Sequence, residues 1–123
     1  KGKVTEMGRK AIVPYGLYRT SGFFNPYFAK QTGFSAEDLD LFWQALMMMW
    51  DFDRSAARGA MACRGLIVFS HESELGNAPA HKLLDRVRIV RRAGVAAPRA
   101  FSDYVVTVDA DGLPEKVKMT VLV

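Results

Sequence analysis

Apolar side chains recur at helical spacing in one stretch of the chain, which predicts the main helix at about residues 36–53. Ser35 and Asp38 occupy the two positions of a capping box, so the helix is expected to begin directly after Ser35. The positions that follow form one apolar face, which a sheet or another helix would bury. The residues of this face are Leu39, Phe42, Trp43, Leu46, Met47 and Trp50.

Strands are predicted on both sides of this helix. Residues 9–19 are rich in β-branched and aromatic side chains, and Pro14 places that strand at a sheet edge or bends it. The aromatic-rich residues 21–33 are expected to form a loop that lies against a surface. Residues 64–69 are apolar almost without a break, which is typical of a central strand covered on both faces.

The C-terminal part predicts a short second helix and three more strands. Asn77 is expected to cap the helix, with Pro79 in its first turn. Residues 86–92 alternate basic and apolar side chains, as in a strand with one basic face. The alternating runs 104–108 and 117–123 flank a turn-forming segment and are predicted to pair as a C-terminal hairpin. These elements together predict an α+β domain with the main helix on one face of an antiparallel sheet.

Length and composition limit the class of protein. The chain has 123 residues, half of them apolar, which provides for one core and one domain. Its single cysteine, Cys63, excludes an internal disulfide, and no apolar run is long enough to span a membrane. The cytoplasm is therefore the expected location.

The charge is unevenly distributed along the chain, although the net charge is only +4. Residues 35–53 carry five acidic and no basic side chains, whereas residues 54–99 carry nine basic and three acidic ones. A fold that joins this basic segment to the basic residues before the helix would present a cationic surface able to hold a polyanion. The alternative is that these charges only solvate the surface.

Two histidines and two carboxylates invite a metal-site interpretation. His71, Glu72, Glu74 and His81 do not match the spacing of a helical His-Glu-x-x-His site, so no metal or other cofactor is expected. No Gly-x-Ser-x-Gly motif is present to make a serine nucleophile.

Four segments, at residues 8–19, 34–39, 53–59 and 71–81, resemble the repeated backbone subunit of type I CRISPR effector complexes, nearest to subtype I-C. The resemblance implies an RRM-like, ferredoxin-type fold, of which this chain would be the C-terminal portion and therefore an incomplete domain. It also implies a non-enzymatic role. Copies of the subunit would polymerise along a guide RNA, beside other CRISPR effector subunits, and present that RNA to target DNA.

The residues themselves indicate how such a chain would hold RNA. An RRM stacks bases on aromatic side chains that follow a Lys/Arg-Gly pair in a strand, but here Arg64-Gly65 is followed by Leu66 and Val68. Contacts to the RNA backbone from basic loops and strand ends are expected instead. The candidate RNA-binding residues are Arg9, Lys10, Tyr18, Arg19, Lys30, Arg54, Arg58 and Arg64.

Two other functions compete with this interpretation. One is a ribonuclease of the same fold, with or without a metal, in which His71 and His81 would serve as acid and base. The other is a structural oligomerisation module whose basic faces bind no nucleic acid.

Overall fold

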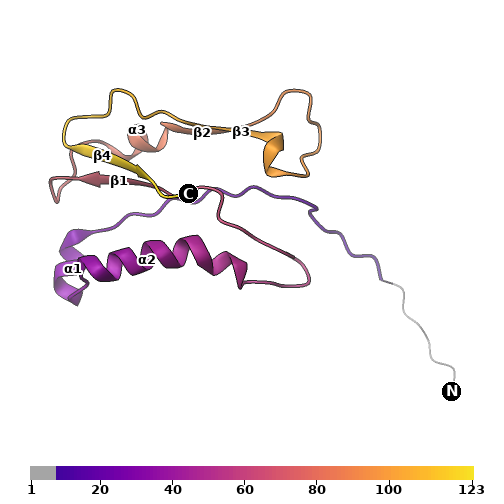
Figure 1. Ribbon diagram of the computed structural model, residues 1–123, viewed down its shortest axis with the longest axis horizontal. Helices are drawn as coiled ribbons and strands as arrows, with labels where there is room; N and C mark the ends of the chain where they lie inside the picture. The colour runs from indigo at the N-terminus through magenta and orange to yellow at the C-terminus, as the bar shows by residue number, and fades with distance from the viewer. Residues whose placement is uncertain (1–7) are drawn as a thin grey trace, which may run out of the picture.

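The computed structural model describes residues 8–123 and places the two longer helices on one side and the strands, together with the short helices α3 and η2, on the other. In Figure 1, α1 and α2 lie below the strands, and the extended segment before α1 runs between the two layers. The α+β class is therefore confirmed. The elements in chain order are α1 (Pro26–Thr32), α2 (Ala36–Met48), η1 (Met49–Asp51), β1 (Ile67–His71), α3 (Ala80–Leu84), β2 (Val87–Arg91), η2 (Phe101–Asp103), β3 (Tyr104–Val108) and β4 (Val117–Val121).

The main helix, α2, begins as predicted. The backbone N–H of Asp38 donates to Ser35 Oγ at 3.1 Å, and the backbone N–H of Ser35 donates to Asp38 Oδ2 at 2.8 Å, which completes the capping box. The predicted end at residue 53 is wrong, because the last turn tightens into η1. Trp50 Nε1 donates to the Leu46 carbonyl at 2.7 Å, and the chain then leaves the helix axis after Asp51.

The first helix, α1, lies where a loop was predicted. Asn25 Oδ1 accepts the backbone N–H of Tyr27 at 2.9 Å, and Pro26 occupies the first helical position. Gly33 ends the helix at φ 74°, a left-handed conformation that glycine adopts without steric cost. Both ends therefore carry ordinary start and stop signals, which the aromatic composition of the segment obscured.

The four strands form two separate two-stranded antiparallel sheets. β1 pairs with β4, with Phe69 opposite Met119, and β2 pairs with β3, with Ile89 opposite Val106. The predicted hairpin of the last two strands is therefore wrong, because the connection after Val108 carries the chain across to β1. Alternation identifies a strand but does not choose its partner.

Three further local predictions are wrong. Within the described residues, 9–19 form no strand, because Pro14 lacks a backbone donor in the middle of that run. In the part of the chain that the structure describes, β1 has one partner strand rather than two, so it is not central in a sheet. Asn77 does not cap α3, because its Oδ1 accepts the backbone N–H of Ser73 at 3.0 Å and Pro79 occupies the N-cap position.

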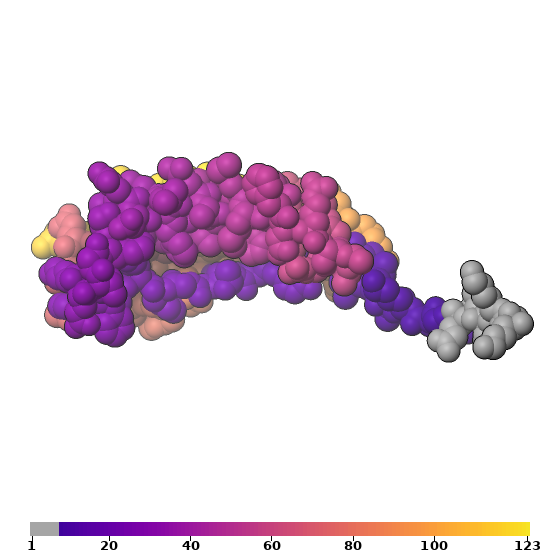
Figure 2. All heavy atoms as spheres, turned by 90° about the horizontal axis from the view of Figure 1, so that it is seen from below, coloured from indigo at the N-terminus to yellow at the C-terminus, as the bar shows by residue number. Residues whose placement is uncertain are grey.

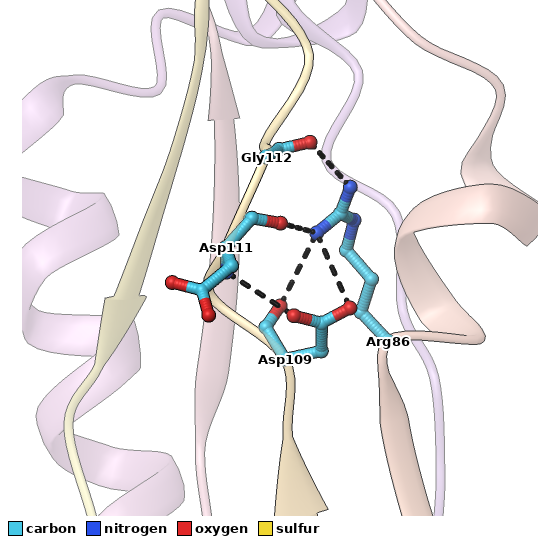
Figure 3. Close-up of polar contacts among 4 residues, drawn as sticks. All are labelled: Arg86, Asp109, Asp111 and Gly112. Atoms are coloured by element: carbon cyan, nitrogen blue, oxygen red, sulfur yellow. Dashed lines mark hydrogen bonds and ion pairs between the residues drawn. The ribbon is translucent and has the colours of Figure 1, made fainter.

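The side chain of Arg86 fixes the connection between β3 and β4 (Figure 3). Its Nη1 donates to the carbonyl oxygens of Asp109 and Asp111 at 3.4 and 2.7 Å, and its Nη2 donates to that of Gly112 at 2.7 Å. The Asp109 carboxylate lies 3.7 Å from Nη1 and also accepts the backbone N–H of Asp111 at 3.1 Å. One largely buried guanidinium thus holds the turn that redirects the chain from β3 toward β1.

Arg86→Lys is expected to lower the free energy of unfolding by about 1–3 kcal/mol, because an ammonium group lacks the planar fork that reaches three carbonyl oxygens. Urea unfolding followed by circular dichroism measures this change. Arg88→Lys, at an exposed position on β2, is the matched control and should shift stability by less than about 0.5 kcal/mol. Equal losses in both variants would show that the Arg86 contacts do not stabilise the turn.

Few side chains are fully buried. Among the described residues, the buried apolar side chains are Leu83, Val87 and Val117. The predicted apolar face of α2 is only half-buried, and its Phe42 is exposed. The chain has 10179 Å² of accessible surface, whereas surface-to-mass scaling gives about 6,600 Å² for a compact monomer of this size.

The excess surface includes apolar side chains on the helical side of the molecule. Figure 2 looks onto this side, where α2 lies at the front. Leu41, Met48 and Phe52 are exposed there by 64%, 58% and 84% of their surface.

Candidate nucleic-acid interface

The candidate RNA-binding residues do not form one continuous surface. Some gather at the turn that follows α2, and others lie beside strands or on α1. Lys10, Arg54 and Arg58 lie at that turn, and Arg9 directly precedes Lys10 in the chain. Arg19 lies beside β2 with the exposed Tyr18 before it, Lys30 is on α1, and Arg64 lies beside η2.

The helix-exit group consists of Lys10, Arg54 and Arg58. Lys10 Nζ donates to the carbonyl oxygen of Ala56 at 3.4 Å, although the two residues are 46 positions apart. Arg54 and Arg58 flank the same turn, and Gly59 closes it with φ 65°. The structure thus brings a residue of the N-terminal basic segment beside the basic residues that follow α2.

Acidic neighbours hold both arginines of this group. Arg58 Nη2 lies 2.9 Å from Asp53 Oδ1, and Arg58 Nε donates to Ser55 Oγ at 3.3 Å. Arg54 Nε donates to the carbonyl oxygen of Asp51 at 3.4 Å. Asp53 thus contributes its carboxylate and Asp51 its backbone carbonyl. The two arginines do not belong to α2, which has already ended before them.

Arg19 and Lys30 make contacts that connect layers of the fold. Arg19 Nη1 and Nη2 donate to the carbonyl oxygens of Val87 and Leu84 at 2.7 and 2.6 Å, which joins the N-terminal segment to α3 and β2. Lys30 forms an ion pair with Glu74, and this hydrogen bond raises the pKa of Lys30. Both side chains therefore have structural partners.

The fold also forms a second basic cluster, the η2 group, which the sequence pattern did not predict. It consists of four arginines on or beside the segment from the end of β2 to η2. Arg64 Cζ lies 4.9 Å from the centroid of the Phe101 ring, in a cation–π contact. Arg92 Nε donates to the Ser102 carbonyl at 3.0 Å. The remaining members are Arg91, whose Nη1 donates to the Ala96 carbonyl at 3.0 Å, and Arg99, whose Nη1 donates to the Pro98 carbonyl at 3.0 Å.

One carboxylate organises the η2 group. Asp103 Oδ2 accepts the backbone N–H groups of Arg99 and Ala100 at 2.7 and 3.0 Å. These two hydrogen bonds lower the pKa of Asp103, and the charges of Arg92 and Arg99 lower it further. A single anion thus faces several cations, so the cluster keeps an excess of positive charge.

The η2 group was missed for a physical reason. The basic alternation of residues 86–92 is visible in the sequence, and it predicted a basic strand face. The approach of Arg64 to Phe101 depends on tertiary structure, which no local spacing encodes. The density of arginines between residues 86 and 99 was the available signal.

Shallow hollows accompany these arginines. One open pocket of about 400 Å³ and another of about 380 Å³ each carry two arginines on their walls. Open, arginine-rimmed hollows suit the phosphates of an extended polymer better than an enclosed small molecule. The first is lined by Arg19, Asp85, Val87, Arg88, Ile89 and Val90, and the second by Arg91, Arg92, Ala93, Gly94, Val95 and Ala96.

The side chain of His71 makes a hydrogen bond with the loop that follows β1. His71 Nδ1 accepts the backbone N–H of Asn77 at 2.9 Å, which folds the following loop over β1. Within residues 8–123, no three side chains of His, Cys, Asp or Glu come close enough to hold a metal ion. His71 therefore serves as a local hydrogen-bond acceptor for the loop that ends before α3.

Comparison with known proteins identifies the family. No helix in the described part of the chain is long and apolar enough to cross a membrane. No curated protein matches the chain. The model of the family described as CRISPR-associated protein Cas7 matches residues 1–109, which is most of the length of this chain. The chain therefore belongs to the CRISPR-associated protein Cas7 family.

Proposed function

We propose that this chain is a guide-RNA-binding part of the repeated backbone subunit of a type I CRISPR effector complex, nearest to subtype I-C. It is the C-terminal portion of a longer, RRM-like subunit and acts in the cytoplasm. Copies of the subunit, with other effector subunits, polymerise along the guide RNA and present it to target DNA. Family membership supports the assignment to a CRISPR complex.

The observation that carries RNA binding is the placement of the two arginine-containing groups. In Figures 1 and 2, the turn after α2 and the η2 segment lie toward the same end of the molecule. The helix-exit group and the η2 group therefore offer positive charge from both layers at that end. Arginine forks bind phosphate oxygens in a bidentate manner, and most of these arginines are solvent-exposed.

The proposal involves no catalytic step and no cofactor. A guide-holding subunit has to bind any guide sequence, and phosphate contacts carry no sequence information. Base pairing between guide and target then supplies the specificity. Basic loops with shallow hollows are consistent with this division of tasks.

The affinity of the full chain for single-stranded RNA is expected to fall steeply as salt rises, because each phosphate contact releases counterions. With about four to six contacts, the slope of log K against log salt concentration should be about −3 to −4 for single strands. Fluorescence anisotropy with labelled RNAs of different sequence, between about 50 and 200 mM salt, measures both slope and base preference. A flat salt dependence would exclude electrostatic holding, and a strong base preference would contradict recognition through the backbone.

A further inference from the structure

Arg64 and Phe101, which come from distant parts of the chain, form a cation–π contact. Arg64 is exposed, and its guanidinium lies over the half-buried Phe101 ring with Cζ 4.9 Å from the centroid. An exposed cation on an aromatic ring contributes only modestly to stability. The contact does, however, hold a planar guanidinium in a fixed place at the surface.

The support beneath this guanidinium is braced from several sides. Asp103 Oδ2 accepts two backbone N–H groups, from Arg99 and Ala100, which close the η2 turn. The backbone N–H of Arg92 donates to the Asp103 carbonyl at 2.8 Å, and Arg92 Nε donates to the Ser102 carbonyl. Phe101 is thus carried by a turn that is hydrogen-bonded to β2, so the ring is positioned before any ligand arrives.

We infer that an unpaired base of single-stranded nucleic acid stacks on the Arg64 guanidinium, with Phe101 as the support beneath it. Bases stack on arginine planes as well as on aromatic rings. Arg92 and Arg99, exposed cations whose charges act on Asp103 of the same turn, supply positive charge for the phosphates next to that base. This inference rests on the proposed function and adds a base contact to it.

The strand that carries the stacking aromatics in an RRM does not provide such a site here. Leu66 and Val68 stand where an RRM strand would carry stacking aromatics, so β1 offers no aromatic platform at these positions. A guanidinium on a ring, in a loop, provides a flat surface that tolerates any base, because every base has a π-face. The site therefore anchors the strand without reading its sequence.

The test compares two ligands of equal length and charge: a uridine RNA oligomer and the same sugar-phosphate chain without bases. Arg64→Lys keeps the charge but removes the planar surface. We expect this variant of the full chain to bind the uridine oligomer about 5- to 100-fold more weakly than the unmodified chain does, and to bind the abasic oligomer equally well. Phe101→Leu should weaken uridine binding in the same direction. Arg99→Lys, in the same cluster but without an aromatic partner, should leave the ratio of the two affinities unchanged.

Each outcome separates this inference from the proposed function. If the unmodified chain binds both oligomers equally, stacking is wrong and backbone holding stands. If it binds neither, both are wrong. If Arg64→Lys weakens both oligomers alike, Arg64 acts as a phosphate ligand and stacking is again wrong. Phe101→Tyr keeps the ring and should retain uridine binding. An unchanged affinity of Phe101→Leu for the abasic oligomer excludes misfolding as the cause of its effect. A deoxyuridine oligomer run in parallel shows whether the stacked strand is RNA or DNA.

Discussion

Leu83→Ala is expected to lower the free energy of unfolding by about 2–5 kcal/mol, because it removes buried methyl groups and leaves a cavity that the surroundings fill only in part. Leu83 lies in α3 and is 2% exposed, the lowest of the three buried apolar side chains in the described chain. Domains of this kind have only about 5–15 kcal/mol of stability in total. The loss is therefore a large share of the total stability.

Urea unfolding followed by circular dichroism, repeated at several protein concentrations, measures the change. Leu75→Ala is the matched control, because Leu75 is 86% exposed and the same atoms are removed from water rather than from a core. Its stability should change by less than about 0.5 kcal/mol. If the two variants lose stability equally, Leu83 does not belong to a packed core.

Local signals predicted the start of α2 because every atom that fixes it lies within four residues. Ser35 and Asp38 bond to each other's backbone, and no distant partner is needed. The end of α2 was less predictable, because it depends on the hydrogen bond from Trp50 to the Leu46 carbonyl and on the tighter turn η1 that follows the helix. Asn25 and Gly33 cap the two ends of α1, and both residue types are ordinary signals for the start and end of a helix. The aromatic content of the segment favoured a loop instead.

The prediction of strand pairing was wrong for a different reason. Residues 104–108 and 117–121 are strands as the alternation predicted, but each pairs with a strand from an earlier part of the chain. The guanidinium of Arg86 selects that arrangement by holding carbonyl oxygens more than twenty residues away. A pattern of side chains along one strand contains no record of such a contact.

In the candidate site, too, some residues follow from local sequence and others come together only through folding. Arg54 and Arg58 were identified from a local reversal of charge after an acidic helix, and the structure places both at the turn that follows α2. Lys10 joined them only through folding. The platform of Arg64 and Phe101 is likewise a tertiary contact, and only its arginine was among the predicted residues.

Changing Arg54 and Arg58 together to glutamine is expected to weaken RNA binding on the order of tenfold for every sequence alike. The salt slope should become shallower by about 1.4, since two phosphate contacts of about 0.7 each are lost on a single strand. Folding should be nearly unaffected, because the Arg58–Asp53 pair is exposed and such pairs contribute about 0–1 kcal/mol. Anisotropy titrations and urea unfolding on the same preparation measure the two effects separately.

A control with equal loss of charge is Lys82→Gln with Lys118→Gln, two exposed positions on α3 and β4. Because this control removes the same net charge, a matching loss of affinity would mean that only the overall charge of the chain matters. The rival role for Arg54 and Arg58 is to neutralise the C-terminal end of α2, which contributes about 0.3–1 kcal/mol and is independent of RNA. If the double variant unfolds more easily and yet binds RNA as before, that role is correct. RNA holding would then pass to Arg9, Lys10 and Arg19, of which Lys10 already lies against the same turn.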